Sequence, residues 1–426
     1  MLYIEKVSLP HTPGFSKAGL IDTFLSDHNN DFYLSFWNKD CNILGSTIAS
    51  QLKNHNIFLG RKFGTTGASI YQAILDNTNT VYEISDADIS IIPAHLLKQF
   101  LTNCTVLIHD YNEGGSFICG KNNLLELLEK LNFVPKKIYL HTSNYNFKNT
   151  NLTNVVVLPY SDMFAIYTAC SVPELVDDQI KRQARLDALE SIRSCRDFQY
   201  HAMVYNRKPR YHRVSLLAEL DTLNILDQCF WTLAWNKEGD IIANDWIKSP
   251  NVLRHQTAIA NKSVKTVNEF LDKYMDTLPK VLPNAPCKDL SGSRYIDLTW
   301  GEKVKWGTAV EVFNYTNSDY PNPQGFLSEK TWRHFLLGIP PLIISASGAN
   351  TSLKELGMQI VDAVDDKLEG DQRVQTIAKF LSDDFHSTII DQKELKKMSL
   401  RNFELVTDKN FLASIVTNSL KDIKLS

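Results

Sequence analysis

The stretch GFLSEKTWRHFLLGIPPLIIS at 325–345 decides the fold more than any other part of this sequence. Ser328 is a residue type preferred at helix N-caps, and Gly338, which precedes two prolines, suits the position just after a helix. The pattern therefore predicts a helix over 329–337. The apolar run that follows predicts a strand over 342–345, so the stretch is one helix-to-strand step of an α/β domain.

The first turn of this helix carries two charged residues. Trp332, Phe335 and Leu336 are spaced i, i+3, i+4 and predict a buried stripe. Glu329 and Lys330 fall outside that stripe, on an exposed turn where free N–H groups and the helix dipole suit a phosphate. Lys330 adds charge for a diphosphate, and Glu329 can accept from both hydroxyls of a ribose. The alternative is a surface helix whose glutamate only complements the dipole.

Outward from this stretch, short apolar runs alternate with helical patterns along the chain. Strands are expected at 31–37, 56–59, 88–92, 105–109, 137–141, 154–159, 200–205, 230–235 and 308–315. Helices are expected at 66–75, 94–101, 122–131, 177–196, 212–223, 353–356 and 371–381. The sequence therefore predicts an α/β protein of two Rossmann-like domains, at 1–195 and 196–426, that face a central cleft.

Composition excludes several classes of protein. The 426 residues, 43% of them hydrophobic, suit two or three folded domains and exclude global disorder or a small disulfide scaffold. The net charge of −3 gives no whole-surface basic footprint for nucleic acid. Seven scattered cysteines without C-x-x-C spacing indicate reduced thiols and no zinc site, and no metal is predicted. No apolar run of ~20 residues or secretory signal occurs, so a cytoplasmic protein without a membrane span is expected.

The motif SEKT at 328–331, followed by GIP at 338–340, resembles the nucleotide-sugar motif of fucosyltransferase-like glycosyltransferases. It looks closer still to their phage-encoded relatives, whose TEKT-type motif is followed by an aromatic and a basic residue, here at 332–333. Serine replaces the usual threonine at the first position, which should preserve capping. In that family the glutamate holds the ribose and the lysine the pyrophosphate, so by position these roles fall on Glu329 and Lys330.

A second segment, HAMVYNRKPRYHRVSLLAEL at 201–220, strengthens the resemblance. It is a strand, a basic loop and a helix, similar to the family's Asn…Arg element, in which an arginine contacts the donor phosphates. The candidate residues are Asn206, Arg207, Arg210 and Arg213. Five basic residues within 207–213 form a local anion site that the net charge conceals. The alternative is a solvated basic loop.

The resemblance implies a metal-independent GT-B glycosyltransferase of inverting stereochemistry. It needs no cofactor besides its co-substrate, a nucleoside-diphosphate sugar, with the donor on 196–426 and the acceptor on 1–195. Glycosyl transfer also needs a base for the acceptor hydroxyl. Asp110 and Glu113, which follow the strand at 105–109, are the candidates, and an ordinary acidic turn is the alternative.

The acceptor is the most open part of the prediction. The phage-like resemblance implies a hydroxylated pyrimidine in phage DNA, modified in the host cytoplasm, with the basic segment 181–213 as a track and the base flipped out of the duplex. The alternatives are a surface polysaccharide as acceptor, or a non-catalytic module that binds nucleotide sugars or DNA. The oligomeric state is not predicted.

Overall fold

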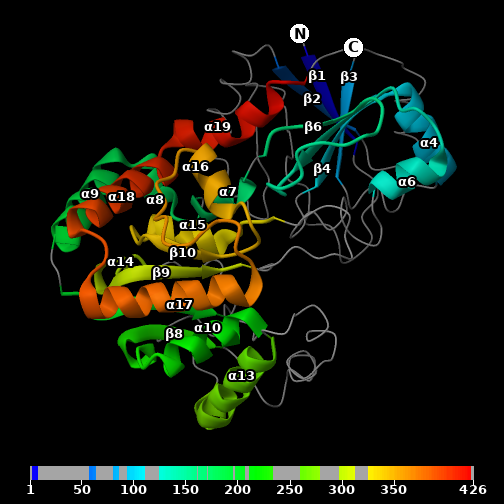
Figure 1. Cartoon of the computed structure of the whole chain (residues 1–426). Coiled ribbons are helices and arrows are strands. Elements are labelled where there is room, and N and C mark those ends of the chain that lie inside the picture. The colour runs from blue at the N-terminus through cyan, green and yellow to red at the C-terminus, as the bar shows by residue number, and fades with distance from the viewer. Residues whose placement is uncertain are drawn as a thin grey trace. The chain divides into compact units, whose positions relative to one another are not determined.

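The computed structural model describes two compact units, each built around its own parallel sheet (Figure 1). The described residues are 2–7, 57–63, 80–85, 94–110, 124–160, 162–169, 171–194, 197–206, 211–233, 260–278, 297–311 and 325–423. Unit 1 comprises Met1–Asp177, Ser318–Phe326 and Asp408–Ser426, and unit 2 comprises Asp178–Asn317 and Leu327–Thr407. The α/β class and the two Rossmann-like domains are confirmed, and the cleft stays a prediction.

Unit 1 contains a sheet with the order β2-β1-β3-β4-β5-β6, in which every pairing is parallel. Its strands are β1 (Leu2–Val7), β2 (Ile57–Phe63), β3 (Thr80–Ser85), β4 (Thr105–Asp110), β5 (Lys137–Thr142) and β6 (Val155–Val157). Its helices are α4 (Ala94–Asn103), α6 (Leu124–Leu131), α7 (Met163–Ala169), α8 (Pro173–Asp177) and α19 (Lys409–Leu420). Side chains of α4, β4 and β5, such as Phe100, Val106 and Leu140, form one buried core.

The predicted elements of unit 1 correspond to β2, β4, β5, β6, α4 and α6. Strands β1 and β3 were not predicted from the sequence. The expected elements at 31–37, 66–75 and 88–92 lie outside the described residues.

Unit 2 contains a parallel sheet with the order β10-β9-β7-β8. Its strands are β7 (Tyr200–Asn206), β8 (Cys229–Leu233), β9 (Val304–Val310) and β10 (Pro341–Ile344). Its helices are α9 (Gln179–Ser194), α10 (Tyr211–Thr222), α13 (Ala260–Tyr274), α14 (Trp300–Lys303), α15 (Glu329–Leu336), α16 (Ala349–Glu355), α17 (Gly370–Ser387) and α18 (Gln392–Val406), with short 3₁₀ turns at Leu226–Gln228 and Met275–Thr277. Each strand predicted for this part of the chain overlaps an observed strand. Strand β9 begins four residues before the expected start at 308 and ends at Val310, and the expected strand residues 312–315 lie outside the described residues.

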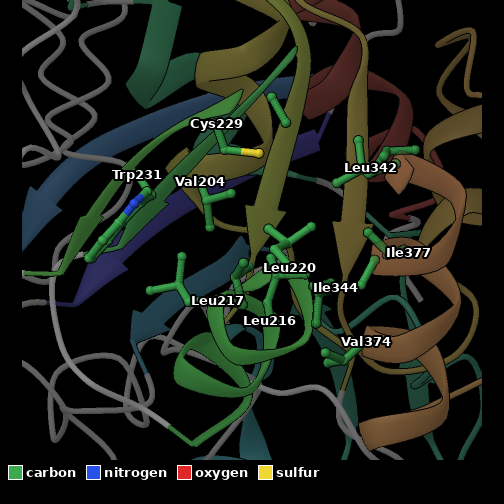
Figure 2. Packing of buried hydrophobic residues seen from close by; sticks show 14 of the residues in the cluster. Val204, Leu216, Leu217, Leu220, Cys229, Trp231, Leu342, Ile344, Val374 and Ile377 are labelled. Carbon is green, nitrogen blue, oxygen red and sulfur yellow. The ribbon is translucent and has the colours of Figure 1, made fainter. Parts of the chain in front are cut away.

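Both faces of the unit 2 sheet are covered, as expected for parallel strands. On one face, Val204 of β7, Leu217 of α10 and Ile377 of α17 belong to one buried cluster, in which Ile377 lies beside Ile344 of β10 (Figure 2). On the other face, Met203 packs with Ile339, which follows α15. The alternation along β7 therefore places α10 and α17 on one side of the sheet and the end of α15 on the other.

The units divide the chain differently from the expected boundary at 195/196. Helix α9 belongs to unit 2, because its buried Arg193 donates to the carbonyl oxygens of Gly301 and Lys305 at 3.1 and 3.0 Å. The C-terminal helix α19 belongs to unit 1, where Ser419 Oγ is hydrogen-bonded to His141 Nε2 at 2.6 Å. The assignment of acceptor and donor to separate domains stays a prediction.

The described residues contain neither a membrane-spanning helix nor a metal-ligand cluster. No helix among them has the length and apolar character needed to cross a membrane. Nor do these residues include a group of three or more His, Cys, Asp or Glu side chains that could hold a metal ion.

Candidate functional site

The C-terminal edge of the unit 2 sheet gathers most of the predicted donor-binding residues that the structure describes. In parallel α/β sheets this edge is where ligands bind, because strand ends and helix N-termini meet there. Glu311, the first residue after β9, lies at this edge and is completely buried. Its N–H donates to the Ile344 carbonyl at 2.9 Å, and His212 Nε2 donates to its carbonyl at 2.8 Å. These bonds join the ends of β9 and β10 to the first turn of α10.

Helix α15 begins and ends as its sequence predicts. Ser328 is the N-cap, and its Oγ accepts from the Lys330 N–H at 3.3 Å. At the other end, Gly338 has φ of +67° and donates to the Phe335 carbonyl at 3.0 Å, while Ile339 donates to the His334 carbonyl at 2.9 Å. This pair of bonds is the Schellman arrangement, for which glycine is favoured. The stripe of Trp332, Phe335 and Leu336 is buried as predicted.

The first turn of α15 is less exposed than the sequence predicts. The side chains of Glu329 and Lys330 retain only 16% and 18% of their accessible surface, and Lys330 Nζ lies 2.9 Å from Glu329 Oε1. Burial raises the pKa of Glu329, but the charge and hydrogen bond of Lys330, together with Arg333, outweigh burial and hold that pKa below its usual value. Glu329 is therefore ionised at neutral pH, next to a cation at a helix N-terminus.

Asn206, the last residue of β7, has a buried side-chain amide without a hydrogen-bond partner among the described residues. The residue is 2% exposed, and its backbone N–H and carbonyl are both paired with Thr232 Oγ1 at 3.0 Å. Within the described residues, neither its Oδ1 nor its Nδ2 has a hydrogen-bond partner. A buried polar group without a partner costs about 1–3 kcal/mol, so this amide is a candidate for a hydrogen bond to a ligand. Because β7 is parallel to β9, with Val204 level with Thr308, this amide lies at the same sheet edge as Glu311.

The remaining predicted residues fall into three groups. Arg213 lies in the first turn of α10, is buried, and donates to the Val310 carbonyl at 3.5 Å, so it shares the edge with Asn206. Arg207, Arg210 and Glu113 lie outside the described residues. Asp110 is the last residue of β4 in unit 1, although the sequence predicts it just after the strand, and its role as a base stays a prediction.

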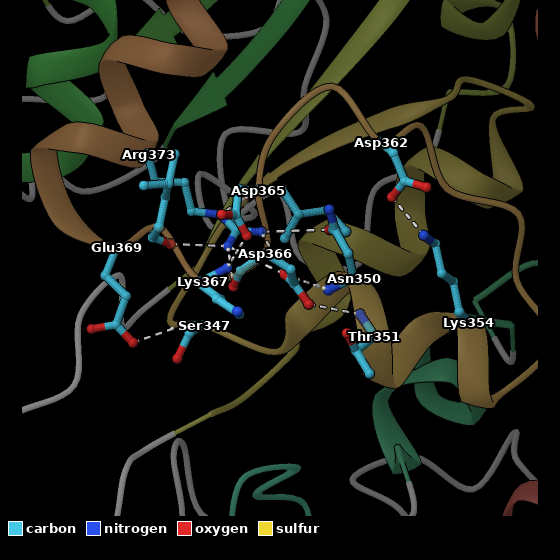
Figure 3. Close-up of polar contacts among 12 residues, drawn as sticks. Ser347, Asn350, Thr351, Lys354, Asp362, Asp365, Asp366, Lys367, Glu369 and Arg373 are labelled. Carbon is cyan, nitrogen blue, oxygen red and sulfur yellow. Dashed lines mark hydrogen bonds and ion pairs between the residues drawn. The ribbon is translucent and has the colours of Figure 1, made fainter.

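Sequence reasoning missed a polar cluster beside β10. Arg373 of α17 is completely buried and binds Asp366 Oδ1 through Nη2 at 3.2 Å and the Ile343 carbonyl through Nε at 2.7 Å (Figure 3). The Asp366 carboxylate accepts in turn from the N–H groups of Asn350 and Thr351 at 3.1 and 2.8 Å. The first turn of α16 is thus capped by the chain's own carboxylate.

Glu311 is the other functional candidate that sequence reasoning missed. Both of its carboxylate oxygens accept from hydroxyls of the α15 motif, Oε2 from Ser328 and Oε1 from Thr331, each at 2.5 Å. The available signal was one glutamate inside the otherwise apolar run TAVEVF at 308–313. A charge in such a run indicates a buried, hydrogen-bonded carboxylate.

Comparisons with known proteins give likenesses of fold. No protein-family model and no curated protein matches the chain. The chain is similar to the N-terminal domain of trehalose-6-phosphate phosphatase from Candida albicans, with 11% identity, 99% and 97% of the two chains covered and a TM-score of 0.43. It is similar to the trehalose-6-phosphate synthase OtsA, with 11% identity, 100% of both chains covered and a TM-score of 0.41. A glycosyltransferase from Rickettsia africae has 9% identity and a TM-score of 0.41, with 97% and 96% covered.

Proposed function

We propose that this chain is a glycosyltransferase that moves a sugar from a nucleoside-diphosphate sugar to a hydroxyl acceptor. The observation that carries the proposal is the pair formed by ionised Glu329 and Lys330 at the first turn of α15, on the sheet edge where the buried Asn206 amide has no partner in the described chain. The fucosyltransferase-like and phage relationships remain part of the proposal, on the strength of the motif at 328–340.

Each group at this edge matches one part of the donor. Lys330 and the N-terminal dipole of α15 supply positive charge for the diphosphate, and the Glu329 carboxylate accepts from the two ribose hydroxyls. The Asn206 amide, which has no partner among the described residues, offers its NH₂ group as donor and its carbonyl oxygen as acceptor to a ligand at the end of β7. Arg213 brings a further cation to the same edge.

In the proposed reaction, the acceptor oxygen attacks the anomeric carbon while the bond to the nucleoside diphosphate breaks, and the configuration at that carbon inverts. The leaving diphosphate gains negative charge, which Lys330 and the α15 N-terminus stabilise without a metal. A carboxylate takes the acceptor proton, and Asp110 and Glu113 remain the proposed bases.

The acceptor proposed first is a hydroxylated pyrimidine in DNA, and a glycan is the alternative. The basic segment 181–213 offers less free charge than its sequence indicates. Arg182 donates to the Thr407 carbonyl at 2.8 Å, Arg185 is paired with Glu302, and Arg193 is buried. Lys181, whose side chain is 61% exposed, lies 3.9 Å from Asp178 but remains accessible to a DNA phosphate.

The proposal is tested by incubating the protein with UDP- and GDP-sugars alone, with hydroxymethylated DNA, or with a polysaccharide panel. We expect release of nucleoside diphosphate and a mass increase on one acceptor class. Release with hydroxymethylated DNA but not with unmodified DNA supports the nucleic-acid acceptor. Binding of the nucleotide sugar without release in any arm contradicts the enzyme and leaves a binding module.

A further inference from the structure

Both carboxylate oxygens of Glu311 are hydrogen-bonded to the α15 motif. Glu311 is completely buried, and its two oxygens accept from Ser328 Oγ and Thr331 Oγ1 at 2.5 Å each. In the described part of the chain, no lysine or arginine lies within ion-pair distance of this carboxylate. Because a buried carboxylate needs hydrogen bonds or a cation, these two hydroxyls are its main stabilisation.

The Ser328 hydroxyl transmits this anchoring to the proposed donor-binding side chains. Its proton is directed to Glu311, so its lone pairs are free to accept from Lys330, from Nζ at 3.0 Å and from the backbone N–H at 3.3 Å. Lys330 Nζ also donates to Glu329 Oε1 at 2.9 Å. A continuous chain of hydrogen bonds therefore runs from the buried carboxylate of Glu311 through Ser328 to Lys330 and Glu329.

The backbone of Glu311 holds the other end of this series of hydrogen bonds in place. It is bonded to β10 through the Ile344 carbonyl and to α10 through His212, next to Arg213. One residue thus connects the first turns of α10 and α15 to the sheet edge. Binding groups must be held to within ~0.5 Å to act together on a ligand, and buried hydrogen bonds are the usual means.

We propose that Glu311 is a positioning residue for nucleoside-diphosphate binding. Its carboxylate anchors the hydroxyls of Ser328 and Thr331. The Ser328 hydroxyl sets the direction of Lys330, which in turn holds Glu329 at the first turn of α15. The role rests on the proposed function, in which Glu329 and Lys330 bind the donor.

The test measures the binding of UDP, GDP, ADP, CDP and dTDP by calorimetry. The thermal stability of the same samples is measured as well. Glu311→Ala should lower the affinity for the nucleoside diphosphate that binds the parent protein by at least tenfold. Glu311→Gln keeps one acceptor oxygen and should lose less affinity. Ser328→Ala breaks the link to Lys330 and should weaken binding as Glu311→Ala does.

Asp384→Ala is the matched control, because Asp384 is an equally buried carboxylate of unit 2. It accepts from Lys305 Nζ at 2.6 Å and Trp306 Nε1 at 2.8 Å, near the start of β9. This variant should lower thermal stability and leave affinity within threefold of the parent. If it weakens binding as much as Glu311→Ala, the role of Glu311 is only structural and the proposal is overturned.

The two proposals fail in distinguishable ways. If the parent protein binds none of the five nucleotides, the donor site is refuted and the positioning role with it. If the parent binds one of them and folded Glu311→Ala binds it with equal affinity, only the positioning role is refuted. Should Glu311→Ala not fold, unchanged affinity in Ser328→Ala gives the same refutation.

Discussion

Strand β9 passes so close to helix α15 that position 307 has no room for a side chain. A Cβ on Gly307 would lie 2.4 Å from His334 Nδ1, 2.7 Å from Cγ and 2.9 Å from Cε1. The His334 ring is 2% exposed, so it cannot swing into solvent without losing the packing of α15 against the strand. Gly307→Ala therefore forces the helix or the ring to move.

The expected cost is that of overpacking a buried contact, about 1–3 kcal/mol. In a unit of this size each kcal/mol lowers the melting temperature by roughly 2–4 °C, so the unit 2 transition should fall by about 2–12 °C. Urea unfolding followed by tryptophan fluorescence measures the free-energy change directly, because Trp306 and Trp332 are both buried in this unit.

A double-mutant cycle identifies the clash as the cause. His334→Ala removes the ring that the new methyl group meets, so Gly307→Ala should cost at least ~1 kcal/mol less in that background than in the parent. A Gly307→Ala protein within about 0.5 kcal/mol of the parent would refute the close approach. Additive costs in the cycle would show that another contact is responsible.

Two further predictions concern buried titratable groups. Burial lowers the pKa of His334 to about 3 and that of His201 to about 4, so both stay neutral in the folded protein while the unfolded chain takes up protons below its ordinary pKa of about 6.5. The stability that these two neutral histidines contribute is complete above pH ~6.5 and is lost as the pH falls, by about 2 kcal/mol per histidine at pH 5. A midpoint of urea unfolding that does not change between pH ~6.5 and pH ~5 would contradict this prediction. Burial also raises the pKa of Cys104 and Cys229 to about 12, so iodoacetamide at pH 8 should label neither in the native protein and both in urea, as peptide mass mapping would show.

The parts of the fold that the sequence predicts best are governed by local rules. The cap at Ser328, the buried stripe and the left-handed Gly338 each depend on residues within one or two turns. Strands β1 (LYIEKV) and β3 (TVYEIS) were missed because charged residues interrupt their apolar pattern, Glu5 and Lys6 in β1 and Glu83 in β3.

Contacts between segments that are distant in the chain could not be predicted from the sequence. Helix α19 packs in unit 1, although it follows the last helix of unit 2 directly in the chain. Its hydrogen bond from Ser419 to His141 joins residues 278 positions apart, which no periodicity encodes.

The candidate site shows the same division. The sequence could predict the positions of Glu329, Lys330 and Asn206, because helix capping and the end of a strand are local features. For Glu311 the sequence signals only a charge within an apolar run, and its partners, two hydroxyls 17 and 20 residues further along the chain, have no local signal. The basic loop at 207–210 gives a clear sequence signal but lies outside the described residues.

Calorimetric titration of Lys330→Ala with nucleoside diphosphates tests the central claim most directly. A charge-assisted hydrogen bond to a phosphate contributes roughly 1.5–3 kcal/mol, so affinity should fall by about 10- to 150-fold. Lys379→Ala is the control, because among the described residues this exposed lysine of unit 2 pairs only with Asp383 on its own helix. This variant should bind as the parent does. Equal affinity of Lys330→Ala and the parent protein would contradict a donor site at the first turn of α15.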